Sequence, residues 1–317
     1  RDIYNYSSLR SKRLLFKAPS IDLRKPKIDL LITSCPLSLN VITNTRKSVS
    51  SLQLIMDFIP LSFSKHPDHP FGFYNRLKDS MKTNYCFISK ASRDKICLLL
   101  EKSCDYDDKN IIYPMPSLDI NKLKLASKIK NFSNLSKKYI LFNSSVVPRK
   151  NLHFLIQIFK SSVIFNSDFN LCVAGKIHKD KYGKDIRAMC EGESNIILLD
   201  YVNEAEKAWL FLNAYAFVSP SCVEGFGIPV LDAACLGLRV LVSDIPSHNE
   251  ISSLVNSNEQ FRLLNLSNVD SWINELNLLN TLDLCIEDEV QNRLSQYNSC
   301  FKLLKENFEK SIVDLVT

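Results

Sequence analysis

The sequence predicts two doubly wound α/β domains that face each other across a cleft. Short β-rich segments alternate with helical patterns along most of the chain, and this alternation is typical of βαβ units with parallel sheets. A polar, lysine-rich stretch at 115–138 separates two such series. We expect a cleft between the domains because open α/β sheets bind ligands beyond the carboxyl ends of their strands.

The first series contains four segments that are rich in β-branched and aromatic residues. They predict strands at 28–33, 52–59, 84–89 and 110–114. A helical pattern with the sequence DKICLLLEK follows the third strand, and Ser89 or Ser92 has a side chain that can cap its start.

The second series is more regular, with each predicted strand leading into a helix or a turn. Strands are expected at 139–144, 170–175, 195–202, 214–219 and 239–244, and helices at 151–162, 180–191 and 204–213. The last of these helices opens with Asn203 and Glu206 in the positions of a capping box. We therefore expect an N-terminal domain over 1–119, a linker over 120–138, a second domain over 139–285 and a terminal helix over 286–317.

The composition indicates a globular protein of the cytoplasm. The 317 residues are 45% hydrophobic and 23% charged, and no apolar run is long enough to cross a bilayer. The first residues lack the apolar core of a signal peptide. Ten cysteines form no CxxC pair or other zinc spacing. Several lie in apolar periodic segments, where a reduced thiol is a small core residue, so we expect a reducing cytoplasm and no metal site.

Charge is distributed unevenly between the two halves. Residues 1–138 hold 25 Lys and Arg against 12 Asp and Glu, a net charge of +13, whereas 139–317 carry −7. One interpretation is a well-solvated surface. The other is that the basic half contacts an anionic partner, either the inner face of a membrane or a phosphorylated acceptor. The basic residues are scattered and no nucleic-acid-binding motif accompanies them, so we expect no nucleic acid.

The stretch AYAFVSPSCVEGFGIPVLDAACLGLRVLVSD, at 214–244, indicates where a ligand binds. A predicted strand runs into Glu224, then into a turn with Gly225 and Gly227, and a helix follows. The glycines allow the backbone to approach a ligand closely, and the helix start offers unpaired N–H groups to an anion such as phosphate. Asp232 lies one turn into the helix, where a carboxylate can accept hydrogen bonds from a diol such as a ribose. This layout suits a nucleotide sugar.

The same stretch closely resembles the E-x7-E motif of glycosyltransferase family 4, whose members are retaining enzymes of the GT-B fold. The family's S-x-x-E-G-F-G-(L/I)-P-x-L-E-A pattern is matched from Ser221 to Ala233, and VLVSDIPSHNEI at 240–251 resembles the segment that follows. Upstream, SSVVPRKNLHFLIQIF resembles the P-R-K-N-L block of the donor domain. The resemblance is strong over 139–251 and weak around LIMDFIP in the first half.

The resemblance implies a transferase that moves a sugar from a nucleotide-diphosphate donor, without a cofactor or metal, to a glycan or lipid-linked acceptor in cell-surface polysaccharide synthesis. Lys150, with Arg149, would neutralise the departing diphosphate, and Glu224 would hold hydroxyls of the donor sugar. The terminal helix would return toward the N-terminal domain. The positions implied for donor binding are Ser144, Tyr201, Val202, Gly225, Phe226, Gly227, Ile228 and Asp232.

Four departures from the family pattern leave a second function open. Asp232 replaces a Glu, Met56-Asp57 stands where many relatives have His-Asp, and Ser144 stands where an Arg is common. The Gly-rich loop after the first N-terminal strand is absent, so we expect an N-terminal domain that is short or incomplete. His66 and His69 lie near the weakly similar region but fit surface positions better than catalytic ones. The alternative is a non-catalytic relative that binds a nucleotide or a partner.

Overall fold

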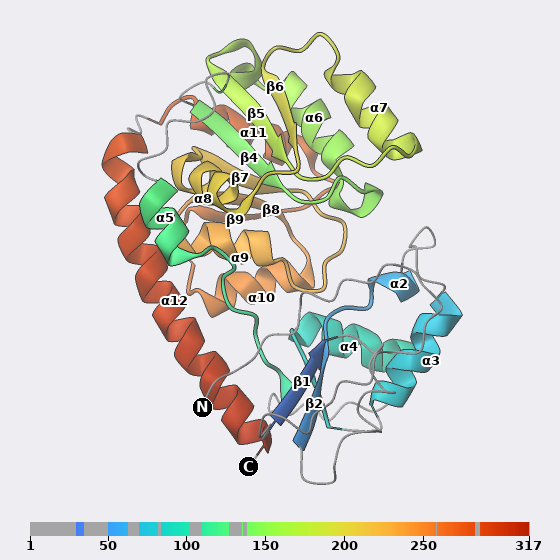
Figure 1. The fold of residues 1–317 in the computed structure, drawn as a ribbon. Helices are drawn as coiled ribbons and strands as arrows, with labels where there is room; N and C mark the ends of the chain where they lie inside the picture. Colours follow the sequence, from blue (N-terminus) through green and yellow to red (C-terminus); the bar gives the residue numbers. More distant parts are fainter. Residues whose placement is uncertain are drawn as a thin grey trace.

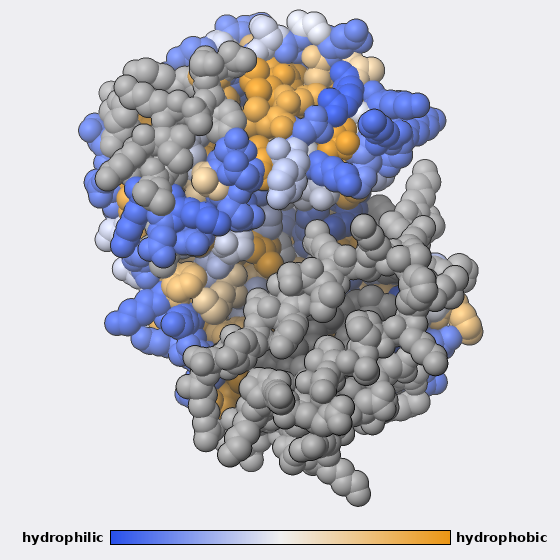
Figure 2. Space-filling model, viewed as in Figure 1, coloured by the Kyte–Doolittle hydropathy of each residue, from blue (hydrophilic) through white to orange (hydrophobic). Residues whose placement is uncertain are grey.

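A computed structural model gives the arrangement of the chain. It describes residues 30–34, 50–62, 70–81, 84–101, 110–126, 135, 138–257, 259–282 and 286–316. Figure 1 shows two lobes with a long helix, α12, along one side of both. We call β1–β3 with α2–α4 the N-terminal lobe, and the sheet β4–β9 with its helices the C-terminal lobe. The surface of the C-terminal lobe that is visible in Figure 2 is largely hydrophilic.

The N-terminal lobe is built on a small parallel sheet in the order β1-β2-β3. Its elements are β1 (Leu30–Ser34), β2 (Ser50–Ile55), α2 (Ile59–Ser62), α3 (Pro70–Ser80), β3 (Tyr85–Phe87) and α4 (Lys90–Leu99). The strand predicted at 110–114 is wrong, because this segment makes only an isolated bridge from Ile111 to Phe87. Ser89 is the N-cap of α4, as predicted, and its hydroxyl accepts from the Ser92 amide at 2.9 Å.

The C-terminal lobe contains a six-stranded parallel sheet in the order β6-β5-β4-β7-β8-β9. Its strands are β4 (Lys138–Asn143), β5 (Phe169–Ala174), β6 (Ile196–Asp200), β7 (Ala216–Ser219), β8 (Arg239–Ser243) and β9 (Phe261–Leu264). The chain winds outward from β4 to one edge and then from β7 to the other. The crossover between β4 and β7 is therefore the topological switch point, the place where doubly wound sheets bind ligands.

Helices cover both faces of this sheet, as the alternation of its buried side chains requires. Tyr139 and Leu141 pack with α8, α9 and α12 on one face, whereas Ile140 and Phe142 pack with α6, α7 and α11 on the other. The bounds are α6 (Leu152–Ser161), α7 (Lys181–Cys190), α8 (Glu204–Asn213), α9 (Ile228–Cys235), α10 (Pro246–Leu254) and α11 (Val269–Leu279), with short 3₁₀ turns η3 (Pro148–Lys150) and η4 (Val163–Asn166). The capping box predicted for α8 is present.

Two further helices connect the lobes. The predicted polar linker contains α5 (Ile120–Ala126), and α12 spans Ile286–Val316. Near its start, α12 is held to the C-terminal lobe by Arg293, which donates to the carbonyls of Leu212 and Ala214 at 2.7 and 2.8 Å. Near its end, Ile312 packs with Leu52 of the N-terminal sheet. The helix therefore touches both lobes, as Figure 1 shows.

The cysteines depart from the sequence-based expectation at one position. Cys97 of α4 is disulfide-bonded, whereas we expected reduced thiols throughout. The described cysteines that are free are Cys86, Cys172, Cys190, Cys222, Cys235 and Cys300. No helix among the described residues is both long and apolar enough to cross a membrane.

Candidate functional site

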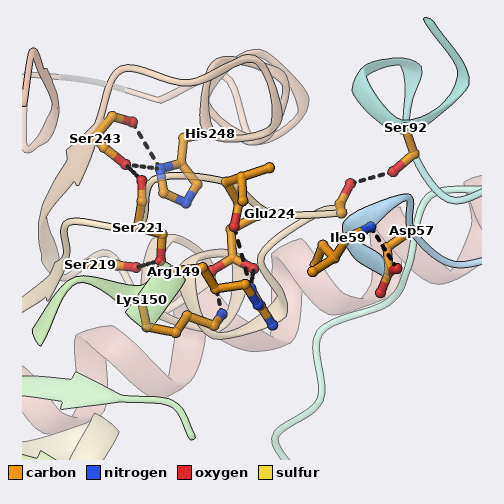
Figure 3. Close-up of polar contacts among 12 residues, drawn as sticks. Asp57, Ile59, Ser92, Arg149, Lys150, Ser219, Ser221, Glu224, Ser243 and His248 are labelled. Atoms are coloured by element: carbon orange, nitrogen blue, oxygen red, sulfur yellow. Dashed lines mark hydrogen bonds and ion pairs between the residues drawn. The ribbon is translucent and has the colours of Figure 1, made fainter. Parts of the chain in front are cut away.

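Two cations and one carboxylate meet where β4 and β7 end. Arg149 and Lys150 form the turn η3 after β4, and Glu224 lies in the loop after β7. Arg149 Nη1 donates to Glu224 Oε2 at 2.8 Å, and Lys150 Nζ donates to Glu224 Oε1 (Figure 3). The backbones of the two loops are also joined, because the Cys222 amide donates to the Arg149 carbonyl at 2.8 Å. The structure thus brings together the three residues predicted to be catalytic.

The environment of this cluster keeps Glu224 ionised. Its side chain is only 6% exposed, and burial by itself would raise the pKa. The charges of Lys150 and Arg149, together with hydrogen bonds from Lys150 and Ser221, outweigh burial and lower the pKa of Glu224 to about 2. The three side chains carry a net charge of +1. Burial lowers the pKa of Lys150, whereas the carboxylates of Glu224 and of Asp57, in the loop after β2, act against this shift.

The turn after Glu224 presents backbone N–H groups next to these cations. Gly227 is the N-cap of α9 and has φ +113°, a conformation that favours glycine. No side chain of the residues that the structure describes caps this helix start. Within the described part of the chain, the amides of Phe226, Gly227 and Ile228 donate to no protein acceptor. A free helix start beside two cations is a site suited to an anion.

The N-terminal lobe approaches this turn closely. An ideal Cβ on Gly225 would lie 2.6 Å from Asp57 Cβ and 2.7 Å from the Met56 carbonyl oxygen, so only glycine fits there. The segment Met56-Asp57, which the sequence analysis noted as a departure from the family pattern, therefore lies directly against Gly225. Asp57 Oδ1 accepts from the Ile59 amide at 3.1 Å, which caps the short helix α2. His66 and His69 lie outside the described residues.

His248 is a buried residue at this site that the sequence did not single out. Its Nδ1 lies 2.8 Å from the Ser243 carbonyl oxygen, so Nδ1 carries the proton and donates. Its Nε2 is buried and has no hydrogen-bond partner among the described residues. Burial lowers the pKa of His248 to about 4, and Nε2 would lie 3.6 Å from a Cβ on Gly227. The signal was available, since this His belongs to the SDIPSHNEI segment that resembles the family.

Asp232 is fully buried and bonds to Ser117, whereas the sequence predicted a contact with a ribose. Its exposure is 0%, and its two oxygens accept from the amide and the hydroxyl of Ser117, both at 2.6 Å. Lys207 Nζ lies 3.6 Å from Oδ2. Burial raises the pKa of Asp232 against the opposing effects of these partners. Asp232 thus fastens α9 to the segment before α5, and its contact with a ribose stays a prediction that requires Ser117 to give way.

The remaining predicted donor-binding positions lie around the same sheet edge. Ser144 follows β4 directly and is half-buried, and its amide donates to the Ala174 carbonyl at 3.1 Å. Tyr201, after β6, is 78% exposed, and Val202 beside it is half-buried. The Phe226 side chain is buried and its ring lies 6.1 Å from that of Tyr113, so its amide alone is available. Among the residues that the structure covers, no three His, Cys, Asp or Glu side chains are grouped to hold a metal ion.

The comparison with family models decides the family. The model described as "Glycosyl transferases group 1" matches residues 124–298, more than half of the chain. The chain belongs to this family. The matched range includes Arg149, Lys150, Glu224 and His248, so the whole cation–carboxylate cluster lies inside the region that matches the family model.

Curated relatives in the group 1 glycosyltransferases are similar at modest identity. The chain is 29% identical over 194 residues to the O-antigen chain mannosyltransferase RfbU of Salmonella typhimurium, covering 59% of this chain and 52% of that protein. It is 26% identical over 235 residues to UDP-Gal:alpha-D-GlcNAc-diphosphoundecaprenol alpha-1,3-galactosyltransferase of Escherichia coli, covering 67% of this chain and 58% of that protein. The chain thus spans little more than half the length of these relatives.

Solved structures confirm the fold class predicted from the sequence. Sucrose-phosphate synthase from Thermosynechococcus elongatus superposes with a TM-score of 0.65 at 13% identity, over 90% of this chain and 73% of that one. WaaG, a glycosyltransferase involved in lipopolysaccharide biosynthesis, superposes with a TM-score of 0.57 at 14% identity, over 88% and 80%. The fold is GT-B, with two Rossmann-like lobes.

Proposed function

We propose that this group 1 glycosyltransferase is a retaining hexosyltransferase of the family 4 type. It transfers a sugar from a nucleotide-diphosphate donor to a glycan or lipid-linked acceptor in cell-surface polysaccharide synthesis. The observation that carries the proposal is the contact of Glu224 with Arg149 and Lys150 at the switch point of the sheet, beside the uncapped start of α9. The named activities of the relatives, O-antigen mannosyl transfer and transfer of galactose to a diphosphoundecaprenol-linked sugar, support the acceptor class.

Sugar transfer from such a donor builds negative charge on the leaving group. The bond between sugar C1 and the diphosphate oxygen breaks, and its electron pair stays on that oxygen. An acceptor hydroxyl oxygen forms the new bond to C1, and its proton passes to the departing diphosphate. Arg149, Lys150 and the amides of 226–228 would stabilise the developing charge more strongly than the charge of the intact donor. This part of the reaction needs neither a cofactor nor a metal.

Glu224 would change partners when the donor binds. In the structure its two oxygens accept from Arg149 and Lys150. A diphosphate with a larger negative charge competes for both cations, and the carboxylate becomes free to accept hydrogen bonds from sugar hydroxyls. Because Glu224 is already ionised and buried, this exchange requires no proton uptake. The nucleotide base would lie near Tyr201 and Val202, at the end of β6.

The experiment that tests the proposal has two stages. A panel of UDP-, GDP- and ADP-sugars is first screened by thermal shift, because a ligand that binds only the folded state raises the unfolding temperature. The donors that bind are then tested for transfer and hydrolysis, with Glu224→Gln beside the wild type. Glu224→Gln should bind the nucleotide and lose turnover. If the wild type binds a nucleotide but neither transfers nor hydrolyses any donor, the non-catalytic alternative replaces the proposal.

A lipid-linked acceptor places the reaction at a membrane, so we further propose that the protein works in the cytoplasm with peripheral contact to the inner face. The net charge of +13 over residues 1–138 supports this contact. Binding to anionic vesicles should weaken steeply with salt, since exposed charges are screened within about 10 Å at 0.1 M salt. Equal binding to neutral and anionic vesicles, or binding to neither, would contradict the membrane contact. The positive charge of residues 1–138 would then be interpreted as an ordinary solvated surface.

A further inference from the structure

Two serine hydroxyls of the N-terminal lobe bond to a single carbonyl in the Glu224 turn. Ser89 Oγ donates to the Gly225 carbonyl oxygen at 2.6 Å, and Ser92 Oγ donates to the same oxygen at 2.8 Å. Both serines are 0% exposed. A carbonyl oxygen has two lone pairs, and here both of them are occupied from the other lobe. The orientation of this peptide group is thereby fixed.

The fixed carbonyl determines the direction of the amide that follows it. The Gly225 C=O and the Phe226 N–H belong to one planar peptide group, in which they point in opposite directions. Because the carbonyl points toward α4, the Phe226 N–H points away from it. That N–H donates to no protein acceptor in the part of the chain that is described. It is the first of the three free amides beside Arg149 and Lys150.

The start of α4 is docked on the C-terminal lobe at a second place. The Glu250 carboxylate, on α10, accepts from the backbone amides of Lys90 at 2.6 Å and Ala91 at 3.2 Å. These are first-turn amides that have no acceptor within their own helix. Gly225 also lies too close to Met56 and Asp57 to accept a Cβ. The serine contacts therefore belong to an interface that several independent contacts define.

We propose that Ser89 and Ser92 are positioning residues for sugar transfer. By holding the Gly225 carbonyl when the lobes are docked, they aim the Phe226 amide at the donor. The inference rests on the proposed function. If the serines have this role, the donor site is complete only when both lobes contribute to it. The serines act through the Gly225–Phe226 peptide group and do not touch the donor.

Ser92 is the position that tests this cleanly. Ser89 also caps α4, so Ser89→Ala would disturb the helix as well as the turn. Among the described residues, the Ser92 hydroxyl donates to the Gly225 carbonyl and to no other acceptor, and alanine favours a helix. Ser92→Ala therefore removes one bond to the turn and leaves the cap in place. Ser92→Thr retains the hydroxyl. Ser299→Ala is the matched control, since Ser299 is an exposed helical serine on α12 that bonds to the Ser295 carbonyl.

Turnover and hydrogen–deuterium exchange are measured for the wild type and the three variants. We expect Ser92→Ala to lower kcat/KM about tenfold, the value of one hydrogen bond, and to raise exchange in the peptide covering 224–227 when UDP or GDP is bound, because the amides of this turn would then donate to the nucleotide. Ser92→Thr should restore both, and Ser299→Ala should change neither. If Ser92 had only a structural role, its replacement would not change exchange at 224–227 and turnover together.

The inference and the proposed function fail in different ways. A wild type that turns over no donor contradicts the proposed function, and exchange at 224–227 with UDP or GDP then decides the role of the serines. Equal exchange of that peptide in the wild type and Ser92→Ala, with and without nucleotide, overturns the positioning role. If the wild type is active, two results overturn the positioning role as well. One is that Ser92→Ala leaves turnover unchanged, and the other is that Ser92→Thr reduces turnover as much as Ser92→Ala does.

Discussion

Arg149 and Glu224 are separated by 75 positions in the sequence, yet the guanidinium Nη1 donates to the carboxylate at 2.8 Å. The order of the sheet explains this contact. Arg149 follows β4 and Glu224 follows β7, and these two strands pair in parallel at the centre of the sheet. Their carboxyl ends therefore meet at one edge, where the chain crosses from one half of the fold to the other.

The contact leads to a first prediction, on Lys150. Lys150→Ala should lower kcat on the order of 10²-fold or more, by analogy with removal of one oxyanion donor. Nucleotide affinity should change less, because the benefit of the cation grows as charge builds on the leaving diphosphate. Nucleotide release gives kcat and calorimetry gives the affinity.

The matched control for this prediction is Lys160→Ala. Lys160 is also on the C-terminal lobe and is paired, with Glu193 at 2.7 Å, but it lies at the far end of α6. Its removal should leave kcat unchanged. An equal effect of both substitutions on kcat, or a loss in Lys150→Ala that comes entirely from weaker nucleotide binding, would contradict a role in the transition state.

Much of the C-terminal lobe and its site could be predicted because the signals are local. The strands from β4 to β8 appear as compact apolar runs, and Asn203 with Glu206 marks the start of α8 within four residues. Glu224 and Lys150 stand in recognisable motifs at strand ends. The strand β9 was missed because it has only four residues, of which Arg262 is exposed.

What the sequence did not predict depends on contacts between distant segments. Ser89 or Ser92 was expected to cap α4, and Ser89 does, but its bond to the Gly225 carbonyl 136 positions away depends on how the lobes dock. Asp232 was expected at a ribose because its spacing from Glu224 fits the family. The spacing cannot show that Ser117, 115 positions earlier, occupies both carboxylate oxygens.

The second prediction separates the two roles of Asp232. Asp232→Glu inserts a methylene group into a site that is 0% exposed, and overpacking of this kind costs about 1–3 kcal/mol. We therefore expect a lower free energy of unfolding and no tighter nucleotide binding. Urea denaturation and calorimetry measure the two quantities. A variant that binds nucleotide more tightly at unchanged stability would instead place Asp232 at the ribose.

The third prediction concerns the attachment of α12. Arg293 is 4% exposed and donates to the carbonyls of Leu212 and Ala214. Arg293→Met fills similar space but leaves both carbonyls without this donor, which should cost about 2–4 kcal/mol. Lys305→Met is the control on the same helix, because Lys305 is 53% exposed and its ion pair with Glu309 contributes little. Equal unfolding free energies for the two variants would contradict the anchoring role.

The fourth prediction uses the buried imidazole of His248, whose pKa burial lowers from 6.5 to about 4. The unfolded chain takes up the proton at a higher pH than the folded protein does. Protonation of His248 therefore favours the unfolded chain, and the free energy of unfolding decreases as the pH falls from 6.5 toward 4. Above pH 6.5 this decrease is absent.

His248→Asn tests this dependence while preserving the local bond. The Asn amide can donate to the Ser243 carbonyl in place of Nδ1, but it neither titrates nor offers the Nε2 acceptor beside Gly227. The difference in unfolding free energy between the wild type and His248→Asn should therefore shift in favour of the variant as the pH is lowered from 6.5 to 4. Urea denaturation at several pH values measures it. A difference that stays constant over this range would mean that His248 has an ordinary pKa, with Nε2 hydrated in solution.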